Sequence, residues 1–230
     1  MNTTSRGLFV TATGTDVGKT YVSALILKRL REAGYDAGYY KAAISGIETD
    51  GRGNLLGDAS YVARVAGLDE PHEHLVSYTY RTAVSPHLAS RLEGNPVDLD
   101  VVRRDYAQAC RRHDLVLVEG SGGIVCPLRW DERARIMLED VVRALSLGAI
   151  VIADAGLGTL NALATTALYL DEKDIPCRGI VLNNYEAGNL LHEDNRLMAS
   201  EITGIPVIVC VPPRAQALDC DAAALASLFD

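Results

Sequence analysis

The stretch "TATGTDVGKT", from Thr11 to Thr20, carries residue types that bind phosphate. It ends in Gly18-Lys19-Thr20, which follows an apolar run and opens a helical pattern, as a phosphate-binding loop requires. In such a loop backbone N–H groups and the helix N-terminus hold the phosphates, the lysine reaches the terminal phosphates, and the hydroxyl binds Mg²⁺. The usual first glycine is missing, because Thr13 stands at its position. A glycine-containing turn with a surface lysine is therefore the alternative.

Two acidic residues are candidate ligands for the magnesium ion that a bound nucleotide needs. Glu119 ends the apolar run "LVLVEG", and Asp58 opens a helical pattern after a glycine-rich stretch. Mg²⁺ in proteins takes one or two carboxylates together with phosphate oxygens. Gly120, Gly122 and Gly123 follow Glu119 and would let the backbone approach phosphates closely. The alternatives are a helix cap or solvated strand end for Glu119 and a plain N-cap for Asp58.

A second lysine, Lys41, ends the apolar run "AGYYKA". If that run is a strand beside the phosphate loop, Lys41 lies at the same edge of the sheet and can stabilise negative charge on a transferring phosphoryl group. The alternative is a surface lysine.

Short apolar runs that alternate with helical patterns must position these side chains. We expect strands within residues 7–12, 37–42, 115–120, 149–156, 178–184 and 203–213, and helices within 20–33, 57–67 and 97–112. Asp98 or Asp100 lies near the start of the third helix, and Ile47 to Leu56 reads as a loop. Such alternation predicts an α/β fold with a mostly parallel sheet covered by helices on both faces, whose ligands bind beyond the carboxyl ends of the strands.

Composition excludes several classes of partner. The 230 residues carry a net charge of −8 without a Lys/Arg block, so we expect no nucleic-acid partner. We expect no membrane association either, because no apolar run is long enough to span a bilayer and the N-terminus lacks a signal-peptide pattern. The five cysteines form no Cys-x-x-Cys pair, which favours reduced thiols in a cytoplasmic protein.

Eight motifs together resemble one known family. They are "FVTATGTDVGKT", "KAAISG", "GDA", "SPH", "LVEGSGG", "GLGTLNA", "GIVLNN" and "VPPRA", and they span most of the chain from Phe9 to Ala215. In this order they resemble the dethiobiotin synthetases, the ATP-dependent carboxylases of biotin biosynthesis. The phosphate loop of that family is one residue longer than the common form, which accounts for Thr13. Two positions depart from the family, which often has glycine at Ala12 and commonly proline at Ala42.

The resemblance implies a reaction and its components. The substrates would be 7,8-diaminopelargonate, CO₂ and ATP, with Mg²⁺ as cofactor. CO₂ adds to one amine as a carbamate, ATP phosphorylates the carbamate to a carbamic-phosphoric anhydride, and the second amine closes the ring and expels phosphate. The products are dethiobiotin, ADP and phosphate. The resemblance also implies a P-loop NTPase-like fold in one domain, residues 1–230, and a homodimer.

The resemblance assigns roles to individual positions. The metal ligands would be Thr20, Asp58 and Glu119, and the catalytic residues Lys19, Lys41, Thr15 and Ser45. The nucleotide would further contact Asp16, Val17, Gly18, Tyr21, Gly120, Ser121, Gly122 and Gly123, with Asn183, Asn184, Val211, Pro212 and Pro213 near the adenine. Thr15, Asp16, Lys41 and Ser45 would also lie near the reacting amines and carbamate.

The substrate's distal carboxylate would bind Gly158, Thr159, Leu160 and Asn161 of the other subunit. A helix N-terminus is a natural place for that anion, although Asn161 could simply be a helix cap.

Three competing interpretations come from related chemistry. A cobyrinate amide synthetase-type ligase needs a glutaminase domain, for which 230 residues leave no room. A partition-type or septum-positioning ATPase switch carries an extra lysine early in its loop, and residues 11–17 contain none. A nucleotide-binding regulatory module without turnover stays open until turnover is measured.

Overall fold

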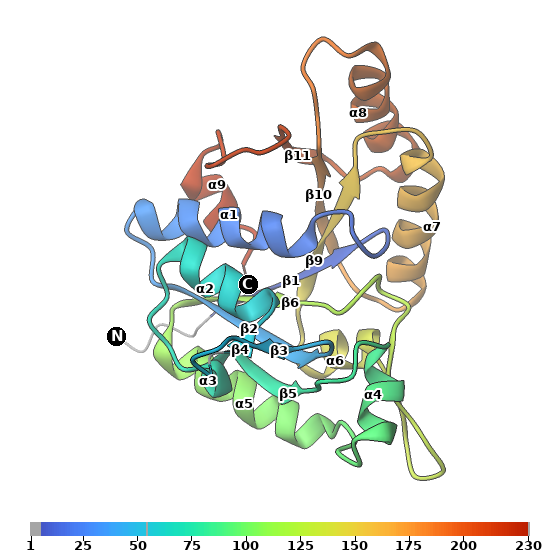
Figure 1. Ribbon diagram of the computed structural model, residues 1–230. Helices are drawn as coiled ribbons and strands as arrows, with labels where there is room; N and C mark the ends of the chain where they lie inside the picture. The colour runs from blue at the N-terminus through green and yellow to red at the C-terminus, as the bar shows by residue number, and fades with distance from the viewer. Residues whose placement is uncertain (1–5, 54, 230) are drawn as a thin grey trace.

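A seven-stranded parallel sheet forms the centre of the computed structural model, which describes residues 6–53 and 55–229 (Figure 1). The strand order is β11-β10-β9-β1-β6-β2-β5, so the first strand of the chain lies in the middle. All six neighbouring pairs run parallel. The strands are β1 (Arg6–Ala12), β2 (Ala37–Ile44), β5 (Val76–Thr79), β6 (Leu115–Glu119), β9 (Gly148–Asp154), β10 (Cys177–Asn183) and β11 (Val207–Val211).

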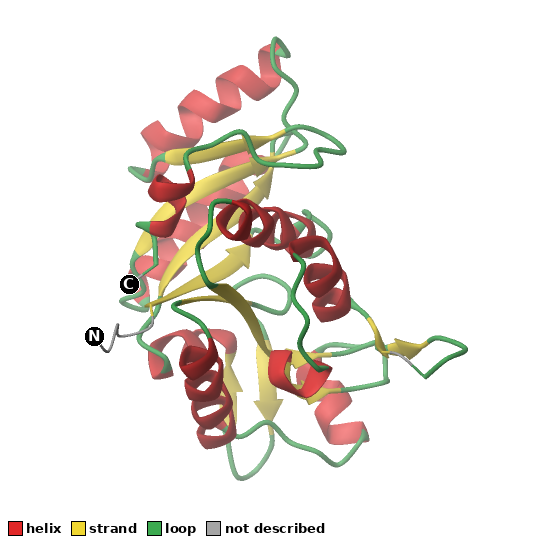
Figure 2. Ribbon diagram, turned by 90° about the vertical axis from the view of Figure 1, so that its left-hand side faces the viewer, coloured by secondary structure: helices red, strands yellow, loops and turns green. Residues whose placement is uncertain are grey.

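Helices cover both faces of this sheet (Figures 1 and 2). They are α1 (Lys19–Glu32), α2 (Asp58–Ala66), α3 (His72–Leu75), α4 (Pro86–Leu92), α5 (Leu99–Arg112), α6 (Leu138–Ala144), α7 (Thr159–Glu172), α8 (Leu190–Thr203) and α9 (Ala222–Ala226). Helices α1, α2 and α9 share one hydrophobic core with residues such as Leu8 and Leu117. Helices α5, α6, α7 and α8 share the other core with residues such as Phe9 and Val118.

The expected fold class is confirmed, since apolar strands buried on both faces are what a parallel sheet between two helical layers requires. Strand alternation explains the two cores: Leu8 and Val10 of β1 point to one face, and Phe9 points to the other. Of the two candidate caps for the third expected helix, Asp98 is the one that caps α5, because its carboxylate accepts a hydrogen bond from the Asp100 backbone N–H.

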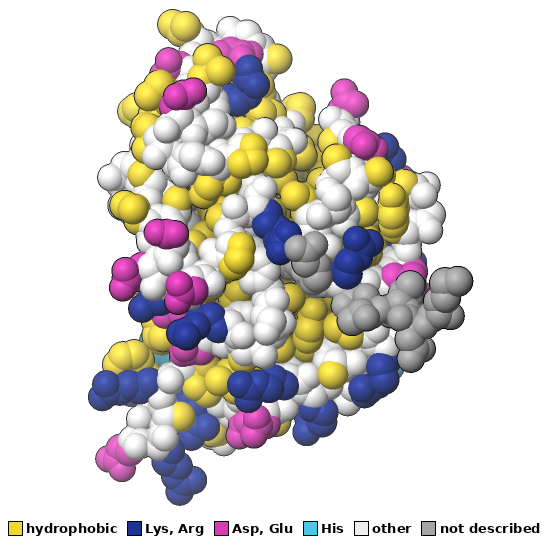
Figure 3. Space-filling model, turned by 180° about the vertical axis from the view of Figure 1, so that it is seen from behind, with side chains coloured by type: hydrophobic (Ala, Val, Ile, Leu, Met, Phe, Trp, Pro, Cys, Tyr) yellow, Lys and Arg dark blue, Asp and Glu magenta, His cyan; other side chains and the backbone are white. Residues whose placement is uncertain are grey.

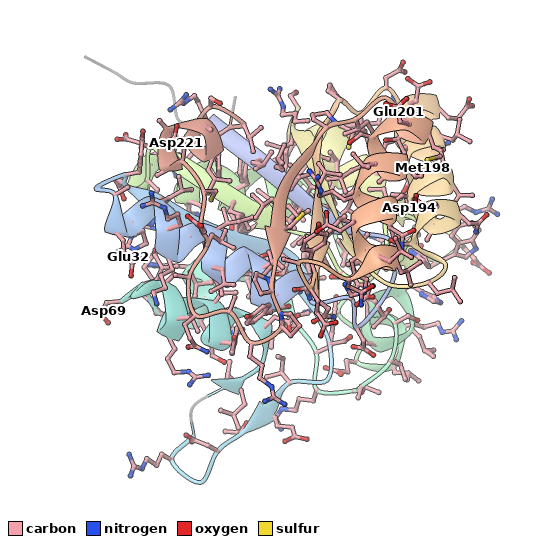
Figure 4. The ribbon with its side chains drawn as sticks, turned by 90° about the horizontal axis from the view of Figure 1, so that it is seen from above. Glu32, Asp69, Asp194, Met198, Glu201 and Asp221 are labelled. Carbon is pink, nitrogen blue, oxygen red and sulfur yellow. The ribbon has the colours of Figure 1, made fainter. Side chains whose placement is uncertain are left out.

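The sequence interpretation missed several short elements. The edge strand β5 has only four residues, and two antiparallel pairs lie outside the main sheet: β3 (Glu48–Thr49) with β4 (Leu55–Leu56), and β7 (Pro127–Trp130) with β8 (Arg135–Met137). Strands this short carry too few residues to show a period of two. The expected loop at 47–56 is thus partly a hairpin, which extends away from the body in Figure 4; Asn54 lies outside the described residues.

Among the described residues, no helix is both long and apolar enough to cross a membrane.

Candidate active site

Strand register brings the candidate catalytic residues together. β2 and β6 are neighbours, and Lys41 pairs directly with Glu119. On its other side β6 pairs with β1, where Val10 is the partner of Glu119. The loop that follows β1, residues 13–18, therefore begins beside the acid, and α1 starts at Lys19. The phosphate loop, Lys41 and Glu119 meet toward the carboxyl edge of the sheet. Glu119 ends its strand as expected, but Lys41 does not, because β2 continues to Ile44.

The loop's conformation depends on Gly18. Its φ of 93° lies in the left-handed region, which L side chains rarely adopt. A Cβ atom added there would lie 2.2 Å from Asn183 Nδ2, so the position also lacks space for a side chain. The Asn183 amide donates to the Val17 carbonyl at 3.0 Å, and Thr13 N–H donates to Ile152 O at 3.0 Å. Contacts from β9 and β10 thus hold both ends of the loop.

A cluster of charges lies beside the loop. Lys41 Nζ donates to Asp58 Oδ2 at 2.5 Å and to Glu119 Oε1 at 2.7 Å. Thr20 Oγ1 donates to the same Glu119 oxygen at 2.9 Å. Lys41 and Glu119 are almost fully buried, whereas the Asp58 side chain is 42% exposed. Burial of a charge is tolerated here because the opposite charge lies at hydrogen-bond distance.

The pKa values follow from this arrangement. Burial alone would lower the pKa of Lys41, but the charges of Glu119 and Asp58 outweigh it and raise that pKa. Burial would raise the pKa of Asp58, but Lys41 outweighs it and lowers that pKa. Lys19 forms no ion pair with any residue that the structure describes, and burial is the main reason its pKa is lowered. Lys41 is thus held as a cation by its partners, and Lys19 lies nearby with its charge less compensated.

The oxygens in this cluster fit a hard divalent cation. Thr20, Asp58 and Glu119 present a hydroxyl and two carboxylates within one group, the donor types that Mg²⁺ prefers. Glu119 Oε2 is buried and has no hydrogen-bond partner among the described residues. The Tyr39 hydroxyl nevertheless lies near enough to the Glu119 carboxylate for that charge to affect the pKa of Tyr39. Burial, followed by the charges of Glu119 and Asp58, raises the pKa of Tyr39 well above its usual value, so this neighbour is a neutral phenol.

A cleft of about 920 Å³ opens in front of this cluster. Its walls include the expected residues Thr15, Asp16, Gly18, Lys19, Thr20, Tyr21, Lys41, Ser45, Asp58, Ser121 and Gly122. Two of their hydroxyls are oriented by backbone carbonyls: Ser45 Oγ donates to Val84 O, and Ser121 Oγ donates to Ala43 O, both at 2.6 Å. This volume lies within the range of small-molecule binding sites.

The expected adenine residues lie at one side of the loop, outside the walls of the cleft. Asn183 ends β10 and pairs in register with Val211 of β11, so Pro212 and Pro213 follow beside it. Asn183 Oδ1 is buried and has no hydrogen-bond partner among the described residues, which leaves an acceptor for an amine. Asn184 points elsewhere, because its Nδ2 donates to Asp154 Oδ2 at 2.6 Å.

The segment Gly158 to Asn161 does not line this cleft. Gly158 is the N-cap of α7 with a φ of 91°, and Thr159 is the helix's first residue. The Asn161 side chain is therefore not an N-cap, because the helix has already begun two residues earlier. The structure brings the three expected metal ligands together, whereas the expected nucleotide residues Val17, Gly120 and Gly123 do not line the cleft. The expected substrate segment lies apart from it as well.

Comparisons with known proteins identify the family. A family model described as an AAA domain matches residues 6–219. The curated ATP-dependent dethiobiotin synthetase BioD of Brachyspira hyodysenteriae is 46% identical over 206 residues, which cover 89% of this chain and 90% of that protein. The enzyme of the same name from Clostridium botulinum strain Loch Maree is 47% identical, with 90% of each chain covered. The chain belongs to the dethiobiotin synthetase family.

Solved structures that resemble this dethiobiotin synthetase family member show the fold alone. The MinC:MinD cell division protein complex of Aquifex aeolicus aligns with a TM-score of 0.57 at 14% identity, covering 90% of this chain and 81% of that one. The signal recognition particle 54 kDa protein of Aeropyrum pernix K1, in complex with GDP, has a TM-score of 0.59 at 15% identity, covering 99% and 49%. These likenesses confirm a P-loop NTPase-like fold. They give no support to the switch-type ATPase, because much higher identity links the chain to the synthetases.

Several cleft residues of this dethiobiotin synthetase family member escaped the sequence interpretation. They are Ile44, Gly57, Tyr61, Ala83, Val84, Ser85, Pro86 and Cys126. Ser85 and Pro86 belong to the "SPH" motif, so the sequence contained a pattern from which this wall of the cleft could have been predicted. Cys126 gave no signal, and burial raises the pKa of its thiol to about 11, which makes it an unreactive wall residue.

Proposed function

We propose that this chain is an ATP-dependent dethiobiotin synthetase that carboxylates and cyclises 7,8-diaminopelargonate. The observation that carries the proposal is the charge cluster in which Lys41 contacts both Asp58 and Glu119, next to Lys19 and Thr20 of the phosphate loop. Two lysines and two carboxylates at one phosphate loop match a reaction in which a carbamate anion must meet the γ-phosphate of ATP.

The residues divide the chemical work. One amine of the substrate attacks CO₂ and loses a proton, and Lys41 stabilises the resulting carbamate anion. A carbamate oxygen then attacks the γ-phosphorus while Lys19 and the loop N–H groups hold the phosphates, and ADP leaves. The second amine attacks the carbonyl carbon of the mixed anhydride, a C–N bond forms, and phosphate departs. Thr15, Asp16 and Ser45 line the cleft where the amines would lie.

Mg²⁺ would be held by Thr20, Asp58 and Glu119. When bound, it neutralises phosphate charge and aligns the terminal phosphates. The hard oxygen donors and the buried Glu119 Oε2 support this assignment.

Asn183 is our candidate for recognition of the base. Its buried Oδ1 accepts no hydrogen bond within the described chain and would accept one from the exocyclic amine of adenine. Guanine presents a carbonyl at the equivalent position, so this contact favours ATP over GTP.

The enzyme would work as a homodimer with shared active sites. The segment Gly158 to Asn161 does not line the cleft of its own chain, as expected if it serves the site of another subunit. Seven of the eleven exposed large hydrophobic side chains in the described chain lie between Leu157 and Ile202. Exposed apolar patches of this kind mark interfaces, so α7 and α8 are the candidate dimer face.

Figure 3 shows hydrophobic side chains distributed over one whole face of the molecule, with most of the Lys and Arg side chains in its lower half. In Figure 4, Asp194, Met198 and Glu201 lie along the outer side of α8. Charged residues at both ends of such a face would form the polar rim of an interface.

The five cysteines form no disulfide, in keeping with the expected cytoplasmic location.

Product formation tests the function directly. The protein is incubated with 7,8-diaminopelargonate, ¹³C-bicarbonate and MgATP, and products are analysed by mass spectrometry. We expect dethiobiotin that contains one ¹³C atom, with one ADP formed per ring. ATP hydrolysis that proceeds equally without the diamine, and without labelled product, would contradict the synthetase and favour a switch-type ATPase.

A further inference from the structure

The turn between β9 and α7 is fixed by hydrogen bonds from side chains that lie outside the turn. Gly158, its last residue, has no side chain, so α7 starts without a side-chain cap. The Thr159 hydroxyl is buried and has no hydrogen-bond partner among the described residues. The first N–H groups of any helix lack partners within the helix, so their direction depends on how the turn before it is fixed.

Asn195 of α8 fixes this turn from one side. Its side-chain amide donates to Ala155 O at 2.9 Å and to Gly156 O at 3.0 Å. The residue is only 4% exposed, although it is polar and lies on an amphipathic helix that packs against α7. One buried amide thus satisfies two successive carbonyls of a segment 40 positions away.

Asp154 fixes the same turn from the other side. Its Oδ1 accepts a hydrogen bond from Gly156 N–H at 2.8 Å, and its Oδ2 accepts one from Asn184 at 2.6 Å. Ala155 N–H also donates to Asn183 O at 2.8 Å. The Gly156 carbonyl also accepts a longer hydrogen bond, of 3.4 Å, from the Thr159 N–H. The Asn195 amide therefore supplies the shorter of the two contacts to that carbonyl, and it is the group that turns the Ala155 carbonyl toward α8.

We propose that Asn195 is a positioning residue for the seat of the substrate carboxylate at the start of α7. This inference rests on the proposed function, in which Gly158 to Asn161 bind that carboxylate. A peptide group is planar, so its C=O and N–H point in opposite directions. With the Gly156 carbonyl held inward by Asn195, the N–H of the same peptide, that of Leu157, points away from α8. Released carbonyls would turn toward other donors or water, and a carbonyl facing the seat repels a carboxylate.

Two substrates distinguish this role from general support of the fold. One is 7,8-diaminopelargonate, and the other is 2,3-diaminononane, in which a methyl group replaces the carboxylate. Asn195→Leu keeps the branching pattern and the number of side-chain heavy atoms, is bulkier, and removes both donated hydrogen bonds. We expect its KM for 7,8-diaminopelargonate to rise by about tenfold, because carbonyls that Asn195 no longer holds can turn toward the bound carboxylate and repel it. Its KM values for 2,3-diaminononane and for ATP should stay within about twofold of the parent.

Asn189→Ala is the matched control. Asn189 caps the same helix by accepting hydrogen bonds from Leu191 N–H and His192 N–H, and it does not touch the turn. This variant should lower the melting temperature but leave both diamine KM values unchanged. Asn195→Ser retains a shorter donor that reaches one carbonyl at most, and should give an intermediate KM. It supplies the test if Asn195→Leu does not fold.

The outcomes distinguish three failures: of the positioning role, of the carboxylate site and of the proposed function. If Asn195→Leu weakens both diamines equally, or neither, while the parent enzyme prefers 7,8-diaminopelargonate, the positioning role is wrong and the proposed seat stands. If the parent uses both diamines with the same KM, the carboxylate seat is wrong, and the positioning role with it. If no dethiobiotin forms at all, the proposed function itself has failed.

Discussion

Lys41 and Glu119 are 78 residues apart, yet they form a buried ion pair of 2.7 Å because their strands lie side by side in register. The same Glu119 oxygen accepts a hydrogen bond from Thr20 of the phosphate loop. In the proposed mechanism the carboxylate of Glu119 therefore serves two purposes: it binds the metal, and it positions Lys41, the cation that stabilises the carbamate.

Removing the charge of Glu119 should weaken Mg²⁺ binding. Glu119→Gln keeps the size of the side chain but loses an anionic oxygen ligand, so the Mg²⁺ concentration for half-maximal activity should rise by about tenfold or more. Titration of the nucleotide-free protein with Mn²⁺, followed by electron paramagnetic resonance, gives a second readout. An unchanged midpoint in both titrations would favour a capping or purely structural role for Glu119.

Lys19 should be essential for turnover. Its position in the loop, beside the phosphates of the proposed complex, makes it a preorganised cation, and loss of such a group typically lowers kcat by about 10²–10³. Steady-state assays of Lys19→Ala at saturating ATP measure this loss. Lys28→Ala, which removes a partly exposed lysine of the same helix, is the control and should keep parental activity. A Lys19→Ala enzyme within about threefold of the parent would remove the loop from the mechanism.

Asp58 should stabilise the fold in a pH-dependent manner. Its pKa in the folded protein is lowered, because Lys41 outweighs the opposing effect of burial. The stabilisation is therefore present above the unfolded pKa, about 3.9, and is lost as pH falls through the folded value. The melting temperature of Asp58→Asn should lie below that of the parent at pH 7, and the difference should close in acid.

Asp100→Asn is the control for that measurement, since its ion pair with Arg103 is highly exposed and such pairs contribute little. A difference between parent and Asp58→Asn that is the same at pH 7 and in strong acid would contradict the electrostatic explanation.

Mixed dimers test whether active sites are shared. Lys19→Ala and Asn161→Leu should each be nearly inactive, the second because the substrate carboxylate loses a polar partner. In a mixed dimer one active site contains both substituted residues, and the other contains neither. Random reassociation makes about half of the dimers mixed, so roughly a quarter of parental activity should return. Mixed dimers verified by mass spectrometry that show no recovery would place both residues in one chain's site.

The sequence was sufficient to predict six of the seven strands of the main sheet, but only the helices α1, α2 and α5 among those that the structure describes. Long apolar runs such as 115–119 and 148–154 predict buried parallel strands, and acidic residues or lysines near the ends of such runs indicate the site. The edge strand Val76–Thr79 was missed because four residues, alternately buried and partly buried, carry little pattern.

Contacts within the site depend on register, which no local pattern encodes. The sequence marked Lys41, Asp58 and Glu119 as separate candidates, but their ion-pair cluster follows from the pairing of β2 with β6 and the position of α2. The role of Asn195 could not be predicted from the sequence, because a single asparagine in an amphipathic helix is usually a surface residue. Only the packing of α8 against α7 shows that its amide points inward.

The central place of β1 has a consequence for synthesis on the ribosome. β1 pairs with β6 and β9, and the loop that follows it is anchored to Ile152. A growing chain therefore exposes residues 11–20 early, but these residues cannot adopt the loop conformation until more than half of the protein has been made. We expect nucleotide to give no protection against proteolysis to nascent chains that end before β9, so their survival depends on chaperones rather than on ATP binding.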